Sequence, residues 1–464
     1  MKITVKNLGI LKQAEFEVGD LTIICGANNT GKTYATYALY GFLTFWNEAF
    51  SYNYINEDDL NKLMTQGKLS IEINAIKKIS QTIIDDACNE YSKNLPMVFG
   101  SGKKSFSDTS FNILLETVDF DIIDQKILTK SPDGRVLCEM IKARNETKLT
   151  IGITASSAEI NVLNKNWFLY QINRNIQYIL YGNNFPAPFI ASIERTGAAM
   201  FQKELDISRN RLLEQLSNRN KDIDFIDLFN DAINDGRYAL PVRRDVDFIR
   251  DLETVTKNES TIVNRKPDIL SDFALLAGGE YKVTREGVYY IFNKGKTKLT
   301  MGESASSVRS LLNLGMYIQH MARPGDFLMI DEPELNLHPK NQRLMARLLA
   351  KLVNANVKVF ITTHSDYILK EFNTLIMLKN ANTFKNHIMD KYKYNENELL
   401  DIDKIRAYIA KKDLTKIDGK TQRQRHNTFV KAPIDMQGIE ISEFDETINE
   451  MNEIQEQLQM NEDF

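Results

Sequence analysis

The stretch GANNTGKT, residues 26–33, has the GxxxxGK[ST] spacing of a loop that holds phosphate groups. In such a loop the glycines let successive backbone N–H groups point at phosphate oxygens, the lysine reaches the outer phosphates, and the hydroxyl binds Mg²⁺. Here these parts are Gly26, Gly31, Lys32 and Thr33. We therefore expect this phosphate loop, residues 26–33, to bind a nucleoside triphosphate together with Mg²⁺.

The segments on either side of the phosphate loop support this interpretation. The strand-like run LTIIC (21–25) precedes it and the helix-like run YATYALYGFLTFW (34–46) follows it, which places a bound anion at a helix N-terminus. Asn28, Asn29 and Thr30 complete the set expected to contact the nucleotide, although the two asparagines could equally form tight turns without touching a ligand. The alternative for the whole loop is a chance Gly-rich turn before a helix.

A second segment with chemical potential begins at Asp326 and reads DFLMIDEPELNLHPKNQ. It has the pattern of an apolar strand that ends in two carboxylates, Asp331 and Glu332, as buried parallel strands do when an acid faces a ligand at the sheet edge. Asp331 would then hold Mg²⁺ directly or through water, and Glu332 would polarise the attacking water as a general base. The alternative is that the acids cap the next helix.

His364 follows another expected strand, VKVFITT (357–363), after the helix-like run QRLMARLLAKLVNAN (342–356). This position is where a residue that senses the γ-phosphate would stand. A histidine after a strand is more often an ordinary loop or core residue, which is the alternative.

Ser306 and Ser307 precede an expected amphipathic helix with Val308, Leu311 and Leu312 on its apolar side. Serine hydroxyls and free helix N–H groups together can bind an anion. A simple helix N-cap is the alternative, and the local sequence alone favours it.

Together these segments resemble the ABC-type ATPases, specifically the soluble branch that contains the SMC, RecF and OLD proteins. In that family two heads pack head to tail around ATP, and the resemblance implies the same for this chain. The residues that would act within one head are Lys32, Thr33, Asp331, Glu332 and His364.

The same resemblance implies that a second head contributes Ser306 and Ser307 across the interface, and that Asn336 lies in the loop that crosses it. The signature stretch GESASSVRS (302–310) lacks the double glycine of transporter ATPases, so the alignment of its serines is open by one residue. The lid glutamine of the family has no assigned position here.

The phrases FIASIERTG, YALPVRRDVDFIRDL and DEPELNLHPKNQ are similar to ATPases found beside phage-exclusion effectors, as in the Septu and PARIS systems. This resemblance implies an ATP-driven sensor or regulator of a separate effector, expected to be a nuclease, with DNA or a phage protein as the trigger. Assembly beyond the dimer stays open. The alternative function is a repair or chromosome-maintenance ATPase that clamps DNA as RecF and SMC proteins do, and the energy subunit of a transporter is disfavoured by the signature stretch.

Arg195 follows a strand-like run and opens a helix in PFIASIERTGAAMFQKEL (188–205). An arginine at this place could touch phosphates or a neighbouring subunit. More often such a residue pairs with a nearby acid.

The expected fold class is α/β, a P-loop ABC-type ATPase head with a mixed sheet, flanking helices, an antiparallel outer sheet and an inserted compact helical arm. We expect the head in residues 1–50 and 270–400, the insertion in 51–269, and a C-terminal segment in 401–464. A β-hairpin in 135–154 and strands in 287–301 that lead into the signature stretch are expected in the outer sheet, and helices are expected in 61–95, 159–182 and 212–235. No heptad pattern persists, so a long coiled-coil rod is not expected.

The C-terminal segment divides by charge into a basic part, 404–431, and a part from Glu440 onward in which every charged residue is acidic. The acidic part carries an apolar stripe of Phe444, Ile448, Met451, Ile454 and Leu458. The stripe could pack on the chain's own sheet or dock a separate protein. Asp401 and Asp403 have the spacing of a TOPRIM acid pair but no preceding glutamate turn, so no built-in nuclease is expected.

The composition sets broader limits. The 464 residues carry 58 Lys and Arg against 62 Asp and Glu, a formal net charge of −4, which argues against a wholly basic surface but permits a local basic patch. The first twenty residues alternate apolar and polar side chains, and no eighteen apolar residues run together, so a cytosolic protein with no membrane contact is expected. Three scattered cysteines indicate neither disulfides nor zinc.

Overall fold

The structure is a computed structural model of the chain. It describes residues 1–102, 104–116, 124–131, 133–155, 164–201, 238–292, 295, 297–381, 384–416, 423–440 and 450–458. Two compact units form: a smaller unit of Met1–Thr4, Phe42–Asn94 and Ser110–Ala187, and a larger unit of Val5–Gly41, Leu95–Thr109 and Pro188–Phe464. These units do not coincide with the division expected from the sequence.

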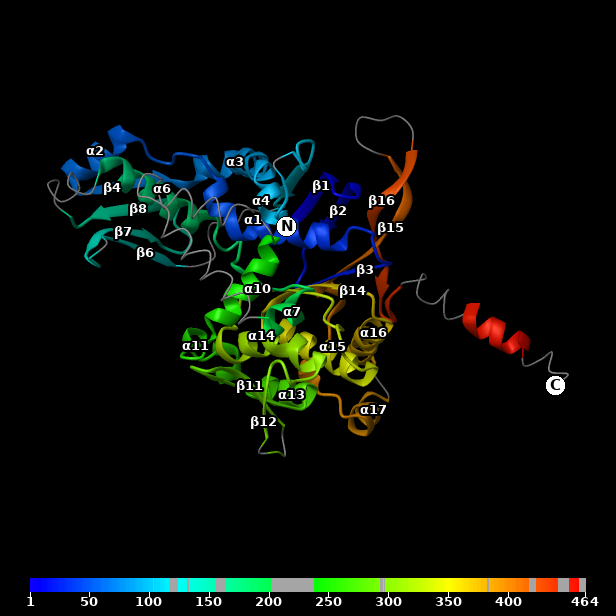
Figure 1. Cartoon of the computed structure of the whole chain (residues 1–464). Helices are drawn as coiled ribbons and strands as arrows, with labels where there is room; N and C mark the ends of the chain where they lie inside the picture. Colours follow the sequence, from blue (N-terminus) through cyan, green and yellow to red (C-terminus); the bar gives the residue numbers. More distant parts are fainter. Residues whose placement is uncertain are drawn as a thin grey trace, which may run out of the picture. The chain divides into compact units, whose positions relative to one another are not determined.

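One mixed sheet organises the sites of interest (Figure 1). Its neighbouring strands are, in order, β1 (Lys2–Leu8), β2 (Leu11–Glu17), β16 (Arg423–Lys431), β15 (Ile405–Lys416), β3 (Leu21–Cys25), β14 (Lys358–Thr363), β13 (Phe327–Asp331) and β9 (Pro188–Ala191). The five strands from β15 to β9 are mutually parallel, whereas β15 and β16 are antiparallel. Every residue of β3 and β13 is buried. Central parallel strands are covered on both faces in this way, which is why their sequences are nearly continuous apolar runs.

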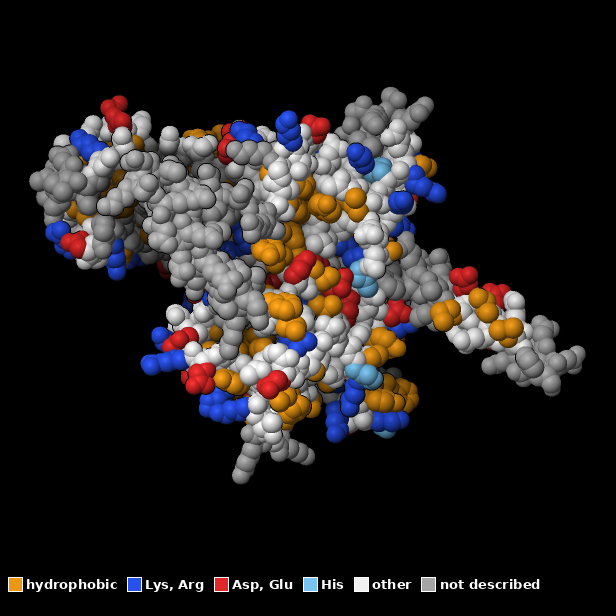
Figure 2. All heavy atoms as spheres, in the orientation of Figure 1, with side chains coloured by type: hydrophobic (Ala, Val, Ile, Leu, Met, Phe, Trp, Pro, Cys, Tyr) orange, Lys and Arg blue, Asp and Glu red, His pale blue; other side chains and the backbone are white. Residues whose placement is uncertain are grey.

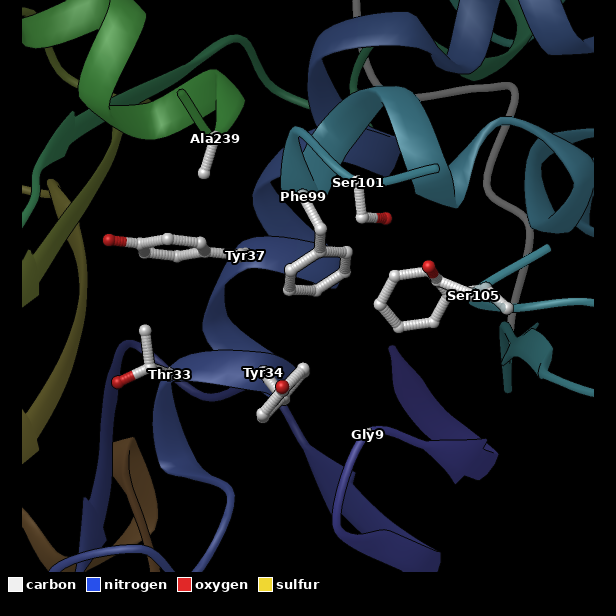
Figure 3. A pocket seen from close by; sticks show the side chains of 9 residues that line it. Gly9, Thr33, Tyr34, Tyr37, Phe99, Ser101, Ser105 and Ala239 are labelled. Atoms are coloured by element: carbon white, nitrogen blue, oxygen red, sulfur yellow. The ribbon is translucent and has the colours of Figure 1, made fainter. Parts of the chain in front are cut away.

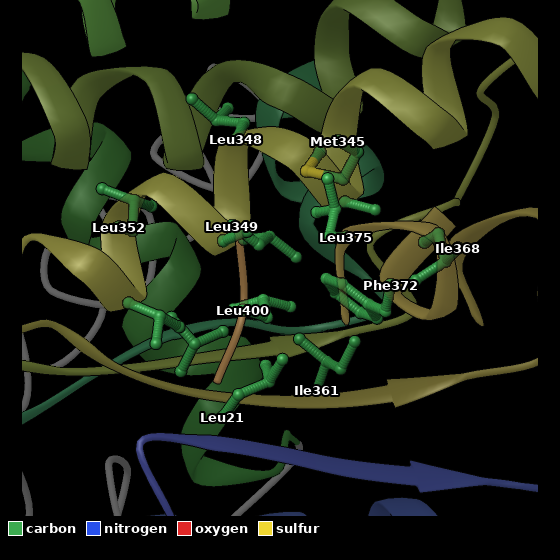
Figure 4. Packing of buried hydrophobic residues seen from close by; sticks show 14 of the residues in the cluster. Leu21, Met345, Leu348, Leu349, Leu352, Ile361, Ile368, Phe372, Leu375 and Leu400 are labelled. Atoms are coloured by element: carbon green, nitrogen blue, oxygen red, sulfur yellow. The ribbon is translucent and has the colours of Figure 1, made fainter. Parts of the chain in front are cut away.

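Helices α13 (Asp268–Ala277), α14 (Ser306–His320), α15 (Pro339–Asn354) and α16 (Asp366–Asn380) contribute to one apolar core with this sheet. In Figure 4, Leu349 of α15, Phe372 of α16 and Leu400 fill the space between the helices and Leu21 and Ile361 of the strands. Each fully buried aliphatic or aromatic side chain of this kind contributes about 1.5–3 kcal/mol relative to exposure. This core holds the carboxyl ends of β3, β13 and β14 in register at one edge of the sheet.

The expected fold class, an α/β P-loop ATPase with a mixed sheet and flanking helices, is confirmed. A separate antiparallel sheet of β10 (Gly279–Thr284), β11 (Gly287–Phe292) and β12 (Lys298–Thr300) leads into α14, as the pattern of residues 287–301 predicted. Val288 and Tyr290 of this sheet pack with Val308 and Leu312 of α14. The start of α14 is therefore anchored to a sheet of its own.

The hairpin predicted in residues 135–154 forms, as β7 (Val136–Lys142) and β8 (Lys148–Ile153). The prediction that this hairpin lies in the outer sheet is wrong. It pairs instead with β4 (Lys68–Glu72) and β6 (Gln125–Lys130) in a four-stranded sheet of the smaller unit. The pairing of β8 with β4 explains this placement. Leu69 and Ile71 of β4 lie opposite Ile151 and Leu149 of β8, and Ile151 and Leu149 are fully buried.

The other elements of the smaller unit include α2 (Glu57–Gln66), α3 (Ile73–Lys93), α6 (Lys165–Tyr181) and β5 (Ser110–Leu114). The helices expected in 61–95 and 159–182 are present in α2, α3 and α6, although β4 interrupts the first. The helix expected in 212–235 lies outside the described residues. In the larger unit the shorter elements are α4 (Leu95–Phe99), α7 (Arg195–Met200), α10 (Leu240–Arg250), α11 (Leu252–Val255), α12 (Thr261–Arg265), α17 (Lys385–Tyr392), β17 (Ile434–Asp435) and β18 (Gly438–Ile439).

The basic part of the C-terminal segment, 404–431, forms strands β15 and β16 of the mixed sheet. Ile405, Ala407 and Ile409 are buried where β15 pairs with β3. Further on, residues 450–458 are helical, and Met451, Ile454 and Leu458 are 56%, 51% and 65% exposed, so this stretch does not bury its apolar stripe. Phe444 and Ile448 lie outside the described residues. Over the residues described, the chain has no helix both long and apolar enough for a membrane span.

Candidate functional site

The phosphate loop connects the end of β3 to the start of α1 (Lys32–Ala49). Gly26 and Gly31 have φ values of 135° and 100°, which favour glycine, and a Cβ on Gly26 would lie 2.3 Å from the Ala410 carbonyl oxygen. The Lys32 ammonium donates to the carbonyl oxygens of Gly26 and Ala27 at 2.9 and 2.8 Å, so the lysine side chain curls over its own loop. Burial lowers the pKa of Lys32, and the carboxylates of Glu332 and Asp331 oppose that shift.

The remaining loop residues give the loop its closed shape. Asn29 adopts φ 59°, as its expected role in a tight turn requires, and the Thr30 hydroxyl donates to Ala27 O at 2.8 Å. Asn28 and Asn29 are exposed, while Thr30 is buried. Because the first N–H groups of α1 have no acceptor within the helix, the loop presents donors to an anion at this point.

Asp331 ends β13 and is 1% exposed. The Thr362 hydroxyl donates to its carboxylate, while its Oδ2 atom is buried without a hydrogen-bond partner. Burial raises the pKa of Asp331, and the hydroxyls of Thr362 and Thr33 oppose this by interacting with the carboxylate. Two segments that are far apart in the chain therefore meet here, and the unsatisfied carboxylate oxygen beside a threonine hydroxyl fits a hard cation such as Mg²⁺.

Glu332 follows directly and has φ 50°, an uncommon value for a residue with a Cβ. Its N–H donates to both the carbonyl and the hydroxyl oxygen of Thr362, each at 3.2 Å. Its carboxylate lies 3.3 Å from His364 Nε2. The hydrogen bond from His364 lowers the pKa of Glu332 against the effect of its partial burial, and Lys32 adds to the lowering. A carboxylate held ionised in this way can accept a hydrogen bond from water.

Glu334 and the two threonines of β14 belong to the same cluster, although the sequence analysis did not select them. Glu334 Oε1 accepts hydrogen bonds from the Thr363 hydroxyl at 2.9 Å and from the His364 N–H at 2.6 Å, and burial raises its pKa. This carboxylate therefore fixes the backbone that presents His364. The signal available in the sequence was the third acid in DEPE beside the paired threonines of ITTH.

Ser306 and Ser307 occupy the first turn of α14, where Ser306 is exposed and Ser307 half-buried. The N-cap is Ala305, with no side-chain capping bond, so the simple N-cap alternative for either serine is wrong. Asn336 is also exposed, with φ 60°. No hydrogen bond between described residues links these three side chains to the phosphate loop, whereas Lys32, Thr33, Asp331, Glu332 and His364 lie together.

A cavity of about 370 Å³ adjoins Thr33 (Figure 3). Its walls include Tyr34, Tyr37 and Phe99, whose rings surround a common space in Figure 3, together with Phe106. The ring centroids of Tyr34 and Phe99 are 5.3 Å apart, and those of Phe99 and Phe106 are 4.8 Å apart and stacked. Flat aromatic walls next to a phosphate loop are suited to a planar heterocycle.

Comparison with known proteins places this site in a family. The AAA_15 family, described as an AAA ATPase domain, matches residues 1–369, and the chain belongs to it. The protein is thus an ATPase-domain protein that binds a nucleotide. No protein with a curated description matches the sequence.

Three similar solved structures are SMC heads. They include the SMC head bound to the C-terminal winged-helix domain of ScpA (13% identity, 94% of this chain and 97% of the other, TM-score 0.33). A Pyrococcus furiosus Smc head with an extended coiled coil, bound to the C-terminal domain of ScpA, has 13% identity over 98% of both chains and a TM-score of 0.32. The Thermotoga maritima SMC head has 10% identity over 93% and 98%, with a TM-score of 0.29. At these TM-scores the likeness supports no conclusion about assembly or partners.

Proposed function

We propose that this protein is a Mg²⁺-dependent ATPase whose heads pair head to tail around ATP and whose hydrolysis cycle regulates a separate effector in bacterial anti-phage defence. The observation that carries the ATPase assignment is the meeting of Thr33, at the end of the phosphate loop, with Asp331, at the end of β13. Each is a suitable ligand for Mg²⁺, and Asp331 keeps an oxygen free of hydrogen bonds. The family match of residues 1–369 supports the same activity.

The roles of the side chains follow from their positions. Lys32 would exchange its bonds to the loop carbonyls for bonds to the outer phosphates, and Thr33 and Asp331 would hold the metal. Bound Mg²⁺ would neutralise charge that develops on the phosphates during transfer. Glu332, ionised and aligned by His364, would accept a hydrogen bond from the attacking water. His364 itself would lie close to the terminal phosphate.

The aromatic cavity beside Thr33 supports a nucleotide rather than a bare phosphate as the ligand. A base stacked on an aromatic ring gains roughly 1–3 kcal/mol. The rings of Tyr34 and Phe99 line the cavity beside the loop with centroids 5.3 Å apart, so a base would stack against a ring face that lines the cavity and not between these two rings.

The regulatory part of the proposal rests on what the site lacks within one chain. Ser306, Ser307 and Asn336 are expected at the nucleotide, yet Ser306 and Asn336 are exposed and Ser307 is half-buried, at the start of α14 and in the loop after β13. A second copy would bring them to the phosphates, so ATP would join two heads and hydrolysis would separate them. The effector, expected to be a nuclease, would be a separate chain that responds to this change, with DNA or a phage protein as trigger.

The ATPase assignment is tested with Glu332→Gln, which keeps the shape of the side chain but removes the base. We expect Mg-ATP binding to be retained and turnover to fall by roughly 10²–10⁴-fold, the usual contribution of a general base. Turnover near that of the wild type would exclude Glu332 as the base. For the regulatory role, affinity purification of the Glu332→Gln protein from cells with and without phage should recover an effector, and recovery of the same proteins by Lys32→Ala would argue against ATP control.

A second function, direct DNA binding by an ATPase of the repair or chromosome-maintenance type, is favoured by one surface. Beyond its pairing with β3, β15 continues with β16 as a two-stranded ribbon (Figure 1). Lys412, Arg423 and Arg425 are exposed on one face of the ribbon, and Figure 2 shows Lys and Arg side chains gathered there. A two-stranded ribbon can enter the major groove of duplex DNA.

The two functions are separated by the salt dependence of DNA binding. If the ribbon binds duplex DNA, the variant Lys412→Ala/Arg423→Ala/Arg425→Ala should reduce the slope of log K against log salt by about 2.7, since each phosphate contact adds about 0.9. The control Lys370→Ala/Lys379→Ala/Lys391→Ala, on α16 and α17, removes the same charge elsewhere. Equal slopes for the two variants, or no DNA binding by the wild type, would favour the defence function.

A further inference from the structure

Arg195 at the start of α7 is 2% exposed and has an unusual set of partners. Its Nε donates to Ser310 O at 2.9 Å, its Nη1 to Ser192 O and Asp331 O at 2.7 Å each, and its Nη2 to Glu332 O at 2.7 Å. All four acceptors are main-chain carbonyls from three separate segments. The guanidinium therefore connects three backbone segments in a fixed geometry, which arginine can provide and lysine cannot.

The sequence suggested that Arg195 touches phosphates or a neighbouring subunit, or pairs with an acid, and this geometry supports none of these three roles. The side chain is enclosed and its donors bind main-chain carbonyls, so it does not reach toward phosphates or a neighbouring subunit. Among the described residues no carboxylate forms an ion pair with it, and burial lowers its pKa while the more distant carboxylates of Asp245 and Asp331 oppose that shift. Its function must therefore be to hold the backbone.

The backbone that Arg195 holds is the one that aims Glu332. A non-glycine residue with positive φ is strained and persists only when its surroundings fix it. Arg195 binds the carbonyls on both sides of that strained position, those of Asp331 and Glu332. Without the guanidinium these carbonyls would lose their charged donors.

The same side chain binds the helix whose first turn carries Ser306 and Ser307. Ser310 belongs to the second turn of α14, and its hydroxyl donates to Ser307 O at 2.9 Å and to Leu335 O at 3.0 Å. A displacement of α14 along its axis would therefore pull on Arg195 and on the loop after Glu332 together.

A parallel connection runs through Asp245 of α10, which is 1% exposed. Its carboxylate accepts from the Ser192 N–H at 3.0 Å and from Asn313 Nδ2 on α14 at 2.6 Å. Ser192 is also a partner of Arg195, so α10, the β9–α7 junction and α14 form one buried polar network. Networks of this kind have few alternative arrangements, because each displaced member leaves a buried polar group unsatisfied.

We propose that Arg195 is a positioning residue that couples α14 to the backbone of Glu332, so that contact made by the exposed first turn of α14 alters the alignment of the catalytic carboxylate. The proposal rests on the ATPase function proposed above for the role of Glu332, but the mechanical connection itself does not. Arg195 touches no nucleotide in this scheme. It would let the pairing of two heads set the rate of hydrolysis in each.

The test uses Arg195→Lys in the full chain, because lysine keeps the charge but cannot reach carbonyls on three segments. We expect kcat to fall roughly 10- to 100-fold, the range found when a residue supporting a catalytic group is changed, with KM and the Kd for ATP within about threefold of wild type because the phosphate loop is untouched. Arg347→Lys is the matched control, since Arg347 of α15 is also largely buried and bridges Glu398, away from the site. The control should show neither effect.

Hydrogen exchange by mass spectrometry provides a readout that needs no turnover. In Arg195→Lys, amides of 332–337 and of the first two turns of α14 should exchange faster together, while those of α15 and α16 remain as in wild type. Unchanged protection in either segment would overturn the coupling, even if turnover falls. If the wild type neither binds nor hydrolyses ATP, the proposed function fails, and the exchange result still decides whether the connection exists. Should Arg195→Lys fail to fold, Asn313→Ala, which loosens the parallel connection, takes its place in the same exchange measurement.

Discussion

The two halves of the expected nucleotide site differ in how complete they are. The half made of the phosphate loop, β13 and β14 is preorganised, with Lys32, Thr33, Asp331, Glu332 and His364 held by one another and by buried backbone. The half carried by α14 is exposed, and its serines make no hydrogen bond to the first half within the described chain. The hydrogen bonds of Arg195 to Ser310 O and Glu332 O join the two halves, and the Ser310 hydroxyl adds a bond to Leu335 O.

This difference indicates that ATP binding and the proposed regulation by pairing of heads depend on different parts of the molecule. In the proposed function, the preorganised half would hold a triphosphate with little change beyond the Lys32 side chain, because its groups already lie at the carboxyl ends of adjacent parallel strands. The exposed half would gain its partners from another molecule. Affinity for ATP should therefore depend on the first half, and assembly on the second.

Among the variants that test this comparison, Lys32→Ala should have the largest effect on the Kd for ATP. Loss of a buried charged donor to the phosphates removes about 1.5–3 kcal/mol, equivalent to roughly 10- to 150-fold in the Kd for ATP. Isothermal titration calorimetry with Mg-ATP measures it, with Lys385→Ala as a control that removes a lysine of α17. An unchanged Kd would refute the assignment of the phosphate loop.

Assembly is tested by replacing both Ser306 and Ser307 with tryptophan. Because Ser306 is exposed and Ser307 half-buried at the start of α14, and neither is bonded to the phosphate loop among the described residues, the bulky rings should leave the Kd for ATP nearly unchanged but prevent pairing of heads. Multi-angle light scattering of the Glu332→Gln background with Mg-ATP should give a dimer without the serine changes and a monomer with them. A dimer in both cases would remove these serines from the interface.

A smaller and more selective effect is expected from Phe99→Ala in the aromatic cavity. Loss of one stacking wall should weaken ATP binding by about 1–3 kcal/mol, roughly 5- to 150-fold, while binding of inorganic tripolyphosphate stays the same. Phe384→Ala, at a position 72% exposed, is the control. Equal losses for both ligands would mean that the cavity shapes the loop and does not bind the base.

The smallest effect concerns Asp245, whose burial raises its pKa to about 7. An aspartate in the unfolded chain releases its proton near pH 3.9, whereas the folded chain holds this one to about pH 7, so the free energy of unfolding falls as pH rises between those values and then levels off. Asp245→Asn removes this pH dependence. The melting temperature of Asp245→Asn minus that of the wild type should therefore increase as the pH rises from about 5 to about 8. Parallel curves would mean that Asp245 beside Arg195 is already ionised in the folded protein at pH 5.

Much of the preorganised half could be predicted from the sequence, because its residues follow buried strands in short, spaced motifs. Gly26, Gly31 and Lys32 are required by local backbone geometry, and the apolar strand before Asp331 and Glu332 is visible as a continuous run. Glu334 and the paired threonines of β14 were missed, because hydrogen bonds between a carboxylate and a neighbouring strand leave no periodic signal.

The amino-acid sequence alone was enough to predict a phosphate-binding loop and an acid-tipped strand, since each depends on interactions among near neighbours: turn conformation, strand alternation and helix start. The folded chain was needed to show that β15, from the basic part of the C-terminal segment, pairs with β3, that the hairpin in 135–154 belongs to the smaller unit, and that Arg195 binds main-chain carbonyls. These depend on strand pairing and burial between segments distant in the chain. An arginine, a hairpin and a basic run each have several possible partners of equal local merit, and packing selects among them.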